Sequence, residues 1–320
     1  MVDIHLHFDG SISPACARRL EELGGVDLSL SDEELHERLS VHEGCRDLNE
    51  YLTRFDFPLS LLQTEAQLAE AAYLLLEELE ALGLAYAELR FAPQYQVLEG
   101  LTQRQAVEAV LAGLSRSSFD AQVILCCMRA EGNESENIET IELAAEYLGR
   151  GVCAVDLAGA EALFPTRDFA DLFVRAERLG VPYTIHAGEA AGPESIREAL
   201  AMGAKRIGHG VRAVEDPALL AQLAREGICC ELCPTSNLNT GVFPSYRVFP
   251  LPAFLEAGVP VAICSDNMSV SGTNAMRERE IMRETFLLDA ATMRELLLNA
   301  AHAAFLSADA RERLVARICA

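Results

Sequence analysis

Residues 175–188, RAERLGVPYTIHAG, contain the pattern that decides the fold. An amphipathic helix is expected to end at Gly180, because glycine readily takes the left-handed conformation that closes a helix. A short run of β-forming residues follows and ends at His186. The same succession of helix, glycine and short strand recurs along the chain. The glycines that end these expected helices are Gly83, Gly149, Gly180, Gly203, Gly227 and Gly258.

Eight runs are expected to be strands once segments 1–8 and 121–129 are added to the runs that follow the glycines. Strands that alternate with helices form a parallel sheet, and eight such strands close a barrel. We therefore predict an α/β fold of the (β/α)8 TIM-barrel type. An open, doubly wound sheet is the second possibility. It is weaker because no glycine-rich phosphate turn follows the first strand.

The length of 320 residues suits one domain, residues 1–320, since α/β barrels commonly take about 250 residues. Residues 10–63 form a long helical insertion between the first strand and its helix. We expect this insertion to act as a lid over the catalytic end. Residues 275–320 are expected to be helical and to pack outside the barrel. Capping-box patterns at Thr64 and Thr102 mark two helix starts.

The composition excludes several classes of partner. A net charge of −23 and a single lysine, Lys205, argue against binding to nucleic acid or to an anionic membrane. No apolar run reaches the ~20 residues of a membrane helix, and no secretory signal is recognised, so a cytoplasmic protein is expected. The ten cysteines show no disulfide spacing. Cys230 and Cys233 form a CxxC on a strand, where they face opposite ways, and are expected in the core.

Polar residues gather at the carboxyl ends of the expected strands, where the active sites of barrels lie. The first strand ends in HLHFD, the fourth in DLAGAE, the fifth in HAGE, the sixth in GHG, the seventh in CPTSN and the eighth in CSDN. Four of the seven histidines lie in these motifs. The other three, His36, His42 and His302, have helical, charged surroundings and are expected at the surface.

A metal site is the main hypothesis for these motifs. His5 and His7 share one face of the first strand, although such a pair alone is more often a pair of core histidines. Together with His186 and Asp266 they form a set of three nitrogen ligands and one oxygen ligand. That set suits Zn²⁺, with Fe²⁺ or Co²⁺ as lesser options. The alternative for Asp266 is a helix N-cap.

The predicted chemistry is hydrolysis. A metal-bound water has its pKa lowered towards ~7 and becomes a nucleophile. Glu189 lies close to the ligands but outside the set, so it can carry a proton to the substrate, while His209 can orient or deprotonate the water. A two-metal barrel hydrolase, which can also begin with H-x-H, usually needs a bridging ligand from the fourth strand, often a carboxylated lysine. That strand has no lysine, and Lys205 begins the sixth strand at the far end of the barrel. One metal is therefore expected.

The motifs together resemble the adenosine deaminase family of metal-dependent amidohydrolases over nearly the whole chain. They are HLHFDGS, FDFPLSLLQT, ELRFAP, DLAGAE, HAGE, RIGHG, CPTSN and SDN, in family order. The resemblance implies a barrel with one zinc ion per chain. It also implies hydrolytic removal of the 6-amino group of adenosine and 2′-deoxyadenosine, which gives inosine or 2′-deoxyinosine and ammonia.

The resemblance also implies roles for residues of this chain. His5, His7, His186 and Asp266 would be the zinc ligands, Glu189 the proton donor to purine N1, and His209 the residue that steers the nucleophile. The N–H of Gly159 would meet N3, and Asp9 would accept a hydrogen bond from the ribose 5′-hydroxyl. Asn267 stands where the family commonly has a second acid that contacts N7. An asparagine amide donates at any pH, so the contact can persist.

Three alternatives remain. The substrate could be another adenine compound, namely adenine, AMP or a modified adenosine. An ionised Asp9 would repel the phosphate of AMP, which favours a purine nucleoside as the small-molecule partner. The chain could also be a barrel hydrolase of cyclic amides or esters, or a zinc-binding pseudoenzyme. Glu189 and His209 argue against the pseudoenzyme, and no obligate protein partner is evident.

Overall fold

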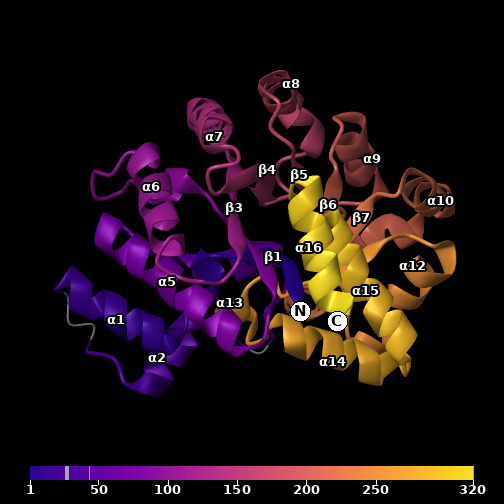
Figure 1. The fold of residues 1–320 in the computed structure, drawn as a ribbon, viewed down its shortest axis with the longest axis horizontal. Coiled ribbons are helices and arrows are strands. Elements are labelled where there is room, and N and C mark those ends of the chain that lie inside the picture. The colour runs from indigo at the N-terminus through magenta and orange to yellow at the C-terminus, as the bar shows by residue number, and fades with distance from the viewer. Residues whose placement is uncertain (26–28, 43, 320) are drawn as a thin grey trace.

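The computed structural model describes residues 1–25, 29–42 and 44–319 and contains a parallel β-barrel (Figure 1). Its eight strands are β1 (Val2–His7), β2 (Tyr86–Phe91), β3 (Ala121–Arg129), β4 (Val152–Gly159), β5 (Thr184–Ala187), β6 (Arg206–His209), β7 (Cys229–Leu232) and β8 (Val261–Ile263). Each strand falls within a segment that the sequence predicts. The structure thus confirms the TIM-barrel prediction over the open sheet.

The barrel consists of two four-stranded sheets that meet at two seams. The sheets have the strand orders β1-β2-β3-β4 and β5-β6-β7-β8, and every strand pairing within them is parallel. A bridge between Val155 and Tyr183 joins β4 to β5. At the other seam, His7 N–H donates to Asp266 O at 2.7 Å and Asp266 N–H donates to His5 O at 2.9 Å. The seam that closes the barrel therefore runs through residues of the predicted site.

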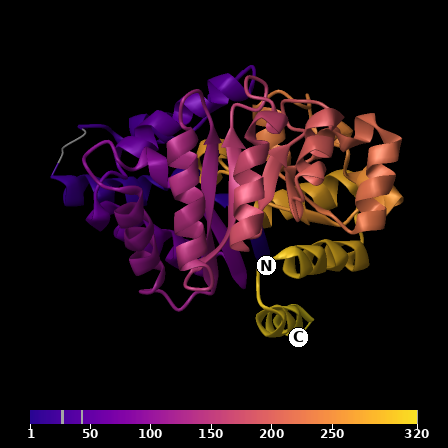
Figure 2. The same ribbon diagram turned by 90° about the horizontal axis from the view of Figure 1, so that it is seen from above.

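Helices cover the outside of the barrel, as Figures 1 and 2 show. They are α5 (Glu65–Ala81), α6 (Gln103–Leu114), α7 (Glu134–Tyr147), α8 (Ala170–Leu179), α9 (Pro193–Ala201), α10 (Pro217–Glu226) and α12 (Leu251–Ala257). The six glycines predicted at helix ends all have positive φ. Thr102 forms a complete capping box, whereas Thr64 Oγ1 accepts from the Gln67 N–H and donates to Gln67 Oε1 without the return bond to the Thr64 N–H.

The insertion at residues 10–63 lies against the segment that follows β8. Its elements are η1 (Asp9–Ser11), α1 (Pro14–Gly24), α2 (Asp32–Leu39), α3 (Leu48–Leu52), η2 (Thr53–Phe55) and α4 (Asp56–Ser60). Residues 26–28 and 43 lie outside the described residues. The insertion bonds to α13 (Met268–Ser271) through Val41 N–H to Val270 O at 2.8 Å and through Tyr51 Oη and Ser271 Oγ, 2.6 Å apart. These contacts place it at the predicted catalytic end, and its action as a lid stays a prediction.

The C-terminal segment is mostly helical, as predicted, with non-helical connections at residues 287–289 and 304–307; residue 320 lies outside the described residues. Its helices are α14 (Ala275–Phe286), α15 (Ala290–Ala303) and α16 (Ala308–Cys319). The turn after α15 covers the end of the barrel opposite the predicted site. There Phe305 N–H donates to Glu88 Oε1 at 2.6 Å, and the Arg206 guanidinium lies 4.0 Å from the centroid of the Phe305 ring.

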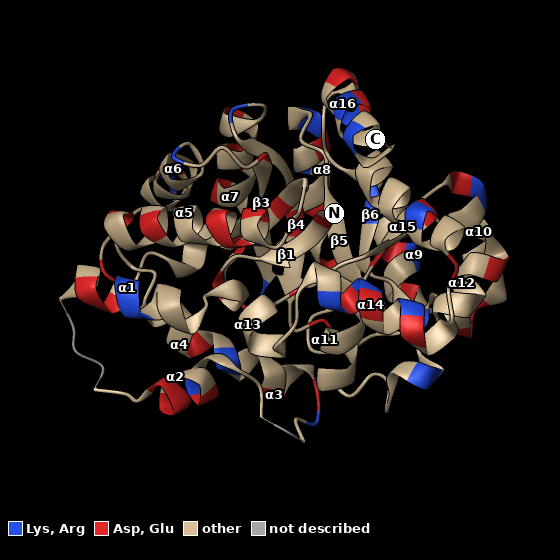
Figure 3. Ribbon diagram, turned by 60° about the horizontal axis from the view of Figure 1, so that its bottom comes forward, with Lys and Arg blue, Asp and Glu red and all other residues tan. Residues whose placement is uncertain are grey.

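The predictions about the surface and the cysteines are confirmed where the structure describes them. His36, His42 and His302 are exposed. Cys230 and Cys233 are buried in different hydrophobic clusters. Acidic and basic residues are interspersed along the helices, and the view in Figure 3 shows no continuous basic face. Among the described helices, none combines the length and the apolar character that crossing a membrane requires.

Candidate active site

The four predicted metal ligands come together at one end of the barrel. One ligand atom from each of His5, His7, His186 and Asp266 lies within 4.8 Å of all the others. Nε2 of His7 is 3.3 Å from Nε2 of His186, and Asp266 Oδ1 is 3.3 Å from His7 Nε2 and 3.4 Å from His5 Nε2. His5 Nε2 is buried without a hydrogen-bond partner among the described residues. Ring nitrogens that converge beside a carboxylate, one of them without a hydrogen-bond partner, fit a bound cation.

Buried charged residues behind the cluster orient two of these histidines. Glu231 Oε2 lies 2.7 Å from His5 Nδ1, and Asp156 Oδ2 lies 2.9 Å from His186 Nδ1. Arg90 bonds to both carboxylates, at 2.8 Å to Asp156 and 2.9 Å to Glu231. A carboxylate at Nδ1 keeps the proton there and leaves the Nε2 lone pair for a metal. The sequence analysis missed these three residues, whose signal was a charge inside an otherwise apolar strand.

The protonation preferences of His7 and Asp266 suit a metal, whereas Asp156, acting against burial, raises the pKa of His186. Burial lowers the pKa of His7 well below its usual value, which favours the neutral imidazole. Burial alone would raise the pKa of Asp266, but the adjacent imidazoles of His5, His7 and His209 hold it well below its usual range. Neutral imidazoles and an ionised carboxylate are the forms that bind metal ions.

Glu189 and His209 lie together beside the cluster. Glu189 Oε1 accepts from Asn237 Nδ2 and Thr240 Oγ1, both at 3.2 Å, and Oε2 is 3.6 Å from His209 Nε2. The Asn237 amide is also 3.1 Å from His209 Nδ1. Burial raises the pKa of Glu189, although His209 opposes the shift, so the carboxyl tends to keep a proton. The sequence analysis quoted CPTSN but gave Asn237 no role.

Two site residues have an unusual backbone conformation. His209 has a φ of 58° and Asp266 a φ of 62°, a region that residues other than glycine rarely adopt. Strained backbone of this kind gathers at functional sites, where it turns a side chain out of the strand alternation. Asp266 does not cap α14, because Asn274 accepts the Arg277 N–H in that role. The N-cap alternative for Asp266 is therefore wrong.

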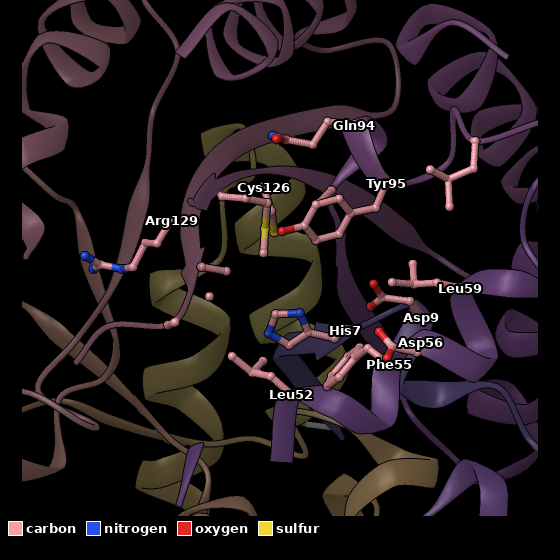
Figure 4. A pocket seen from close by; sticks show the side chains of 16 residues that line it. His7, Asp9, Leu52, Phe55, Asp56, Leu59, Gln94, Tyr95, Cys126 and Arg129 are labelled. Carbon is pink, nitrogen blue, oxygen red and sulfur yellow. The ribbon is translucent and has the colours of Figure 1, made fainter. Parts of the chain in front are cut away.

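A cavity of about 420 Å³ opens beside the cluster and is shown in Figure 4. His7 points into it, and the insertion supplies one wall. A smaller space of about 40 Å³ lies next to His186, Glu189, His209 and Asp266. Gly159 lines both spaces and has a φ of 102°, which favours glycine. The main cavity is lined by His7, Asp9, Leu52, Phe55, Asp56, Leu59, Ala92, Gln94, Tyr95, Leu98, Cys126, Met128, Arg129, Ala158, Gly159 and Ala160.

The charges around this cavity differ in part from the sequence expectation. Asp9 lines it as expected, but burial raises the pKa of its carboxyl to about 7, so it is not a fixed negative charge. Asp56 of the insertion adds a second carboxyl. Arg129 is the one lysine or arginine among the described lining residues. Its guanidinium donates to Phe164 O at 2.8 Å and His186 O at 2.6 Å, which leaves it poorly placed to bind a ligand anion.

Asn267 lies in the wall of the smaller space, beside Gly10 and Tyr51. A Cβ atom added to Gly10 would lie 1.8 Å from Asn267 Oδ1, so only glycine fits there. Asn267 Oδ1 is buried without a partner among the described residues. The side chain is thus held against the insertion, at the edge of the space where a substrate ring would lie.

Comparisons with known proteins agree with this geometry. The family model described as adenosine deaminase matches residues 1–320. An adenosine deaminase of Haemophilus ducreyi is 47% identical over 327 residues, which cover 99% of this chain and 95% of the relative. An Arabidopsis N6-mAMP deaminase has a TM-score of 0.86 at 25% identity, with 99% of this chain and 97% of that chain covered. An amidohydrolase of Burkholderia ambifaria with bound Zn has a TM-score of 0.89 at 21% identity, with coverages of 99% and 89%, and shows the shared fold alone.

Proposed function

The chain belongs to the adenosine deaminase family, and from that membership we propose that it hydrolyses adenosine and 2′-deoxyadenosine to inosine or 2′-deoxyinosine and ammonia. The observation that carries the proposal is that the ligand cluster, a carboxyl with a raised pKa and a neighbouring imidazole lie together beside the main cavity and the smaller space, which share His7 and Gly159 in their walls. The cavity of about 420 Å³ lies within the roughly 300–1,000 Å³ range of small-molecule sites.

We propose that one zinc ion is held by His5, His7, His186 and Asp266. When bound, zinc lowers the pKa of a water molecule towards ~7 and so supplies the nucleophile. A second group of potential ligands comprises His5, His209, Cys233 and Asp266. It shares His5 and Asp266 with the first, so it offers no independent second site. Lys205 is exposed and precedes β6, at the end opposite His209, which also supports a single ion.

The proposed proton transfers use Glu189 and His209. Glu189 donates its proton to purine N1, which makes C6 electrophilic. His209 orients the attacking water or takes its proton, and the Asn237 amide holds it in register with Glu189. Around the substrate, Gly159 N–H meets N3, Asn267 Nδ2 donates to N7, and Asp9 accepts from the 5′-hydroxyl. All three residues line the two spaces beside the cluster.

A second candidate substrate is another adenine compound, such as adenine, AMP or a modified adenosine. The likeness to an N6-mAMP deaminase supports considering it. The cavity argues against a 5′-phosphate, because the guanidinium of Arg129 is bonded to backbone oxygens and two carboxyls line the walls. Family membership argues against a hydrolase of cyclic amides or esters. A small-molecule purine substrate, the lack of an obligate protein partner and a cytoplasmic location remain predictions.

Ammonia release from adenosine, 2′-deoxyadenosine, adenine and AMP tests the proposal, with methylamine release from N6-methyl-AMP as a further arm. The zinc-loaded protein should act on both nucleosides with the highest kcat/KM. The Glu189→Gln variant serves as a matched control for contaminating deaminase. A kcat/KM for a nucleotide or for adenine above that for adenosine would replace the nucleoside assignment with the corresponding alternative.

A further inference from the structure

Glu161 is a buried carboxylate that the proposed chemistry does not use. It follows β4 in the motif DLAGAE and is 2% exposed. Its Oε1 accepts from Gly188 N–H at 2.7 Å and from Ser195 Oγ at 2.5 Å. Its Oε2 accepts from the N–H groups of Glu189, Ala190 and Ala191, at 3.0, 2.7 and 3.0 Å. One side chain thus binds four consecutive backbone amides.

These four amides form the turn that carries Glu189. β5 ends at Ala187, so no strand ladder holds the turn that follows, and α9 begins only at Pro193. Buried N–H groups need acceptors, and hydrogen bonds to a charged acceptor are roughly twice as strong as neutral ones. Glu161 supplies the acceptors that neither the strand nor the helix offers.

We propose that Glu161 is a positioning residue: it fixes the backbone of the Gly188–Ala191 turn and thereby aims the Glu189 carboxyl at the substrate. This inference rests on the proposed role of Glu189 as the proton donor. Glu161 lines neither the main cavity nor the smaller space, so it does not touch the substrate. It acts through the backbone of another residue.

The two ends of Glu189 are held from different parts of the chain. Asn237 and Thr240, which follow β7, bond to its carboxyl, whereas Glu161, which follows β4, bonds to its N–H. Without the contacts from Glu161, the backbone of the turn could move, and the Glu189 carboxyl would shift relative to the substrate even though Asn237 and Thr240 still bond to it. A misplacement of about 1 Å can cost about 10²-fold in rate, because proton transfer depends on close approach.

Replacement of Glu161 by glutamine is a sharp test, because the two side chains have nearly the same shape. Either orientation of the amide places its NH₂ group against donors. One orientation opposes Gly188 N–H and the Ser195 hydroxyl, and the other opposes three backbone N–H groups. In either orientation, one part of the hydrogen-bond clamp that Glu161 forms on the backbone of residues 188–191 is therefore lost, while the volume of the side chain is kept.

The experiment measures steady-state kinetics, zinc content and hydrogen exchange in the wild type, Glu161→Gln, Glu189→Gln and the double variant. Glu161→Gln should lower kcat by about 10- to 100-fold with little change in KM and in zinc content. Amides of residues 188–191 should exchange faster. The double variant should be no slower than Glu189→Gln alone, because Glu161 acts only through Glu189. Glu198→Gln is the matched control, since Glu198 lies on α9 and accepts the Arg167 N–H at 3.0 Å but does not reach the turn.

An unchanged kcat in Glu161→Gln, or a double variant whose loss is the product of the two single losses, would overturn the proposal. If Glu161→Gln does not fold, Glu161→Asp decides, because it keeps the charge but shortens the side chain by one methylene, so that the carboxylate cannot reach all four backbone amides. It should lower kcat severalfold and add no loss to Glu189→Gln; a wild-type kcat would overturn the proposal. If the wild type releases no ammonia, the proposed function is refuted instead. In that case, equal hydrogen exchange at residues 188–191 in the wild type and in Glu161→Gln would also refute the role of Glu161 in fixing the turn.

Discussion

The two halves of the barrel differ in the length of their strands and in the roles of the residues at the carboxyl ends of those strands. Strands β1–β4 have six, six, nine and eight residues, whereas β5–β8 have four, four, four and three. The longer strands of the first half lead into most of the walls of the main cavity, with Met128 and Arg129 on β3 and Gly159 on β4. The shorter strands lead into Glu189, His209 and Asp266.

The strands β5 and β7 end early, so that strand pairing offers no acceptors to the N–H groups of the residues that follow them. In the second half, the acceptors come from buried carboxyl groups elsewhere in the chain. Glu161 bonds to the turn after β5, and Glu278 of α14 accepts the Thr235 N–H after β7 at 3.0 Å. The comparison teaches that the first half of the chain supplies the walls of the main cavity, while in the second half the turns after β5 and β7 are held by carboxyl groups from distant parts of the chain.

The largest expected effect comes from Asp266, which ends the short-strand half and closes the barrel. Asp266→Ala should lose metal and reduce activity by more than the roughly 10- to 100-fold that loss of an outer-shell partner costs. The reason is that it removes the one carboxylate of the ligand cluster. Metal analysis and ammonia release measure the effect. A fully active variant would show that the residue after β8 is not part of the site, and the second half would then not supply all the reactive groups assigned to it.

The next prediction compares a variant of the second half, which should affect the chemical step, with a variant of the first half, which should affect substrate binding. Glu189→Gln should keep its zinc and lower kcat by about 10²–10⁴-fold, the usual worth of general acid catalysis. Met128→Leu, a volume-conserving change in the cavity wall, should alter KM more than kcat. Steady-state kinetics distinguish the two. Loss of zinc from Glu189→Gln would make Glu189 a ligand and move the acid elsewhere.

Rejection of a 5′-phosphate tests the first half alone. Two like charges ~4 Å apart cost on the order of 4 kcal/mol at an effective dielectric of about 20, which is roughly a thousandfold. Since the pKa of Asp9 is about 7, its charge is only partial near neutrality and the preference for adenosine over AMP should stay below that limit. Asp9→Asn should narrow the ratio of the two kcat/KM values. An unchanged ratio would show that Asp9 does not face the 5′ end.

A smaller effect is expected where the two halves meet, at Asn267. If its amide donates to N7, replacement of N7 by carbon in 7-deazaadenosine should weaken kcat/KM by about 1–3 kcal/mol, the cost of a buried unpaired donor. Asn267→Ala provides the control, because it should respond equally to both nucleosides. Equal kcat/KM values for the two compounds in the wild type would show that Asn267 does not read N7.

The smallest effect on activity, with a measurable effect on stability, is expected at Glu278. Burial raises its pKa to about 7, against about 4.3 in an unfolded chain. The folded state therefore holds a proton that the unfolded state loses, so this contribution to stability is fully present below about pH 4.3 and is lost as pH rises through about 7. Glu278→Gln should flatten the corresponding fall in the free energy of unfolding. Denaturant unfolding at pH 4.5 and 7.5 checks this. An equal fall in the free energy of unfolding in the wild type and in Glu278→Gln would show that protonation of Glu278 is not the cause.

The sequence predicts those parts of the molecule that depend on local pattern. Each expected strand contains an observed one, and the four ligand residues converge because every parallel strand brings its carboxyl end to the same rim. The roles of Arg90, Asp156 and Glu231 could not be predicted, since they depend on which strands face one another across the interior. Glu161 escaped notice for the same reason: its partners are backbone amides, which carry no signature in the sequence. The partial charge of Asp9 arises mainly from burial, with a smaller contribution from the nearby Asp266 carboxylate, and neither can be read from local pattern.

Because the barrel closes between β1 and β8, the proposed metal site can form only when both halves of the barrel have come together. His5 and His7 belong to the first half-barrel, and His186 and Asp266 to the second, so neither half alone contains the full ligand set. A fragment that stops at the midpoint of the chain could form its own ladder, yet it could not complete the coordination sphere. High-affinity metal uptake would then report the final joining of the chain's first and last strands, and fragment complementation rather than either fragment alone would restore it.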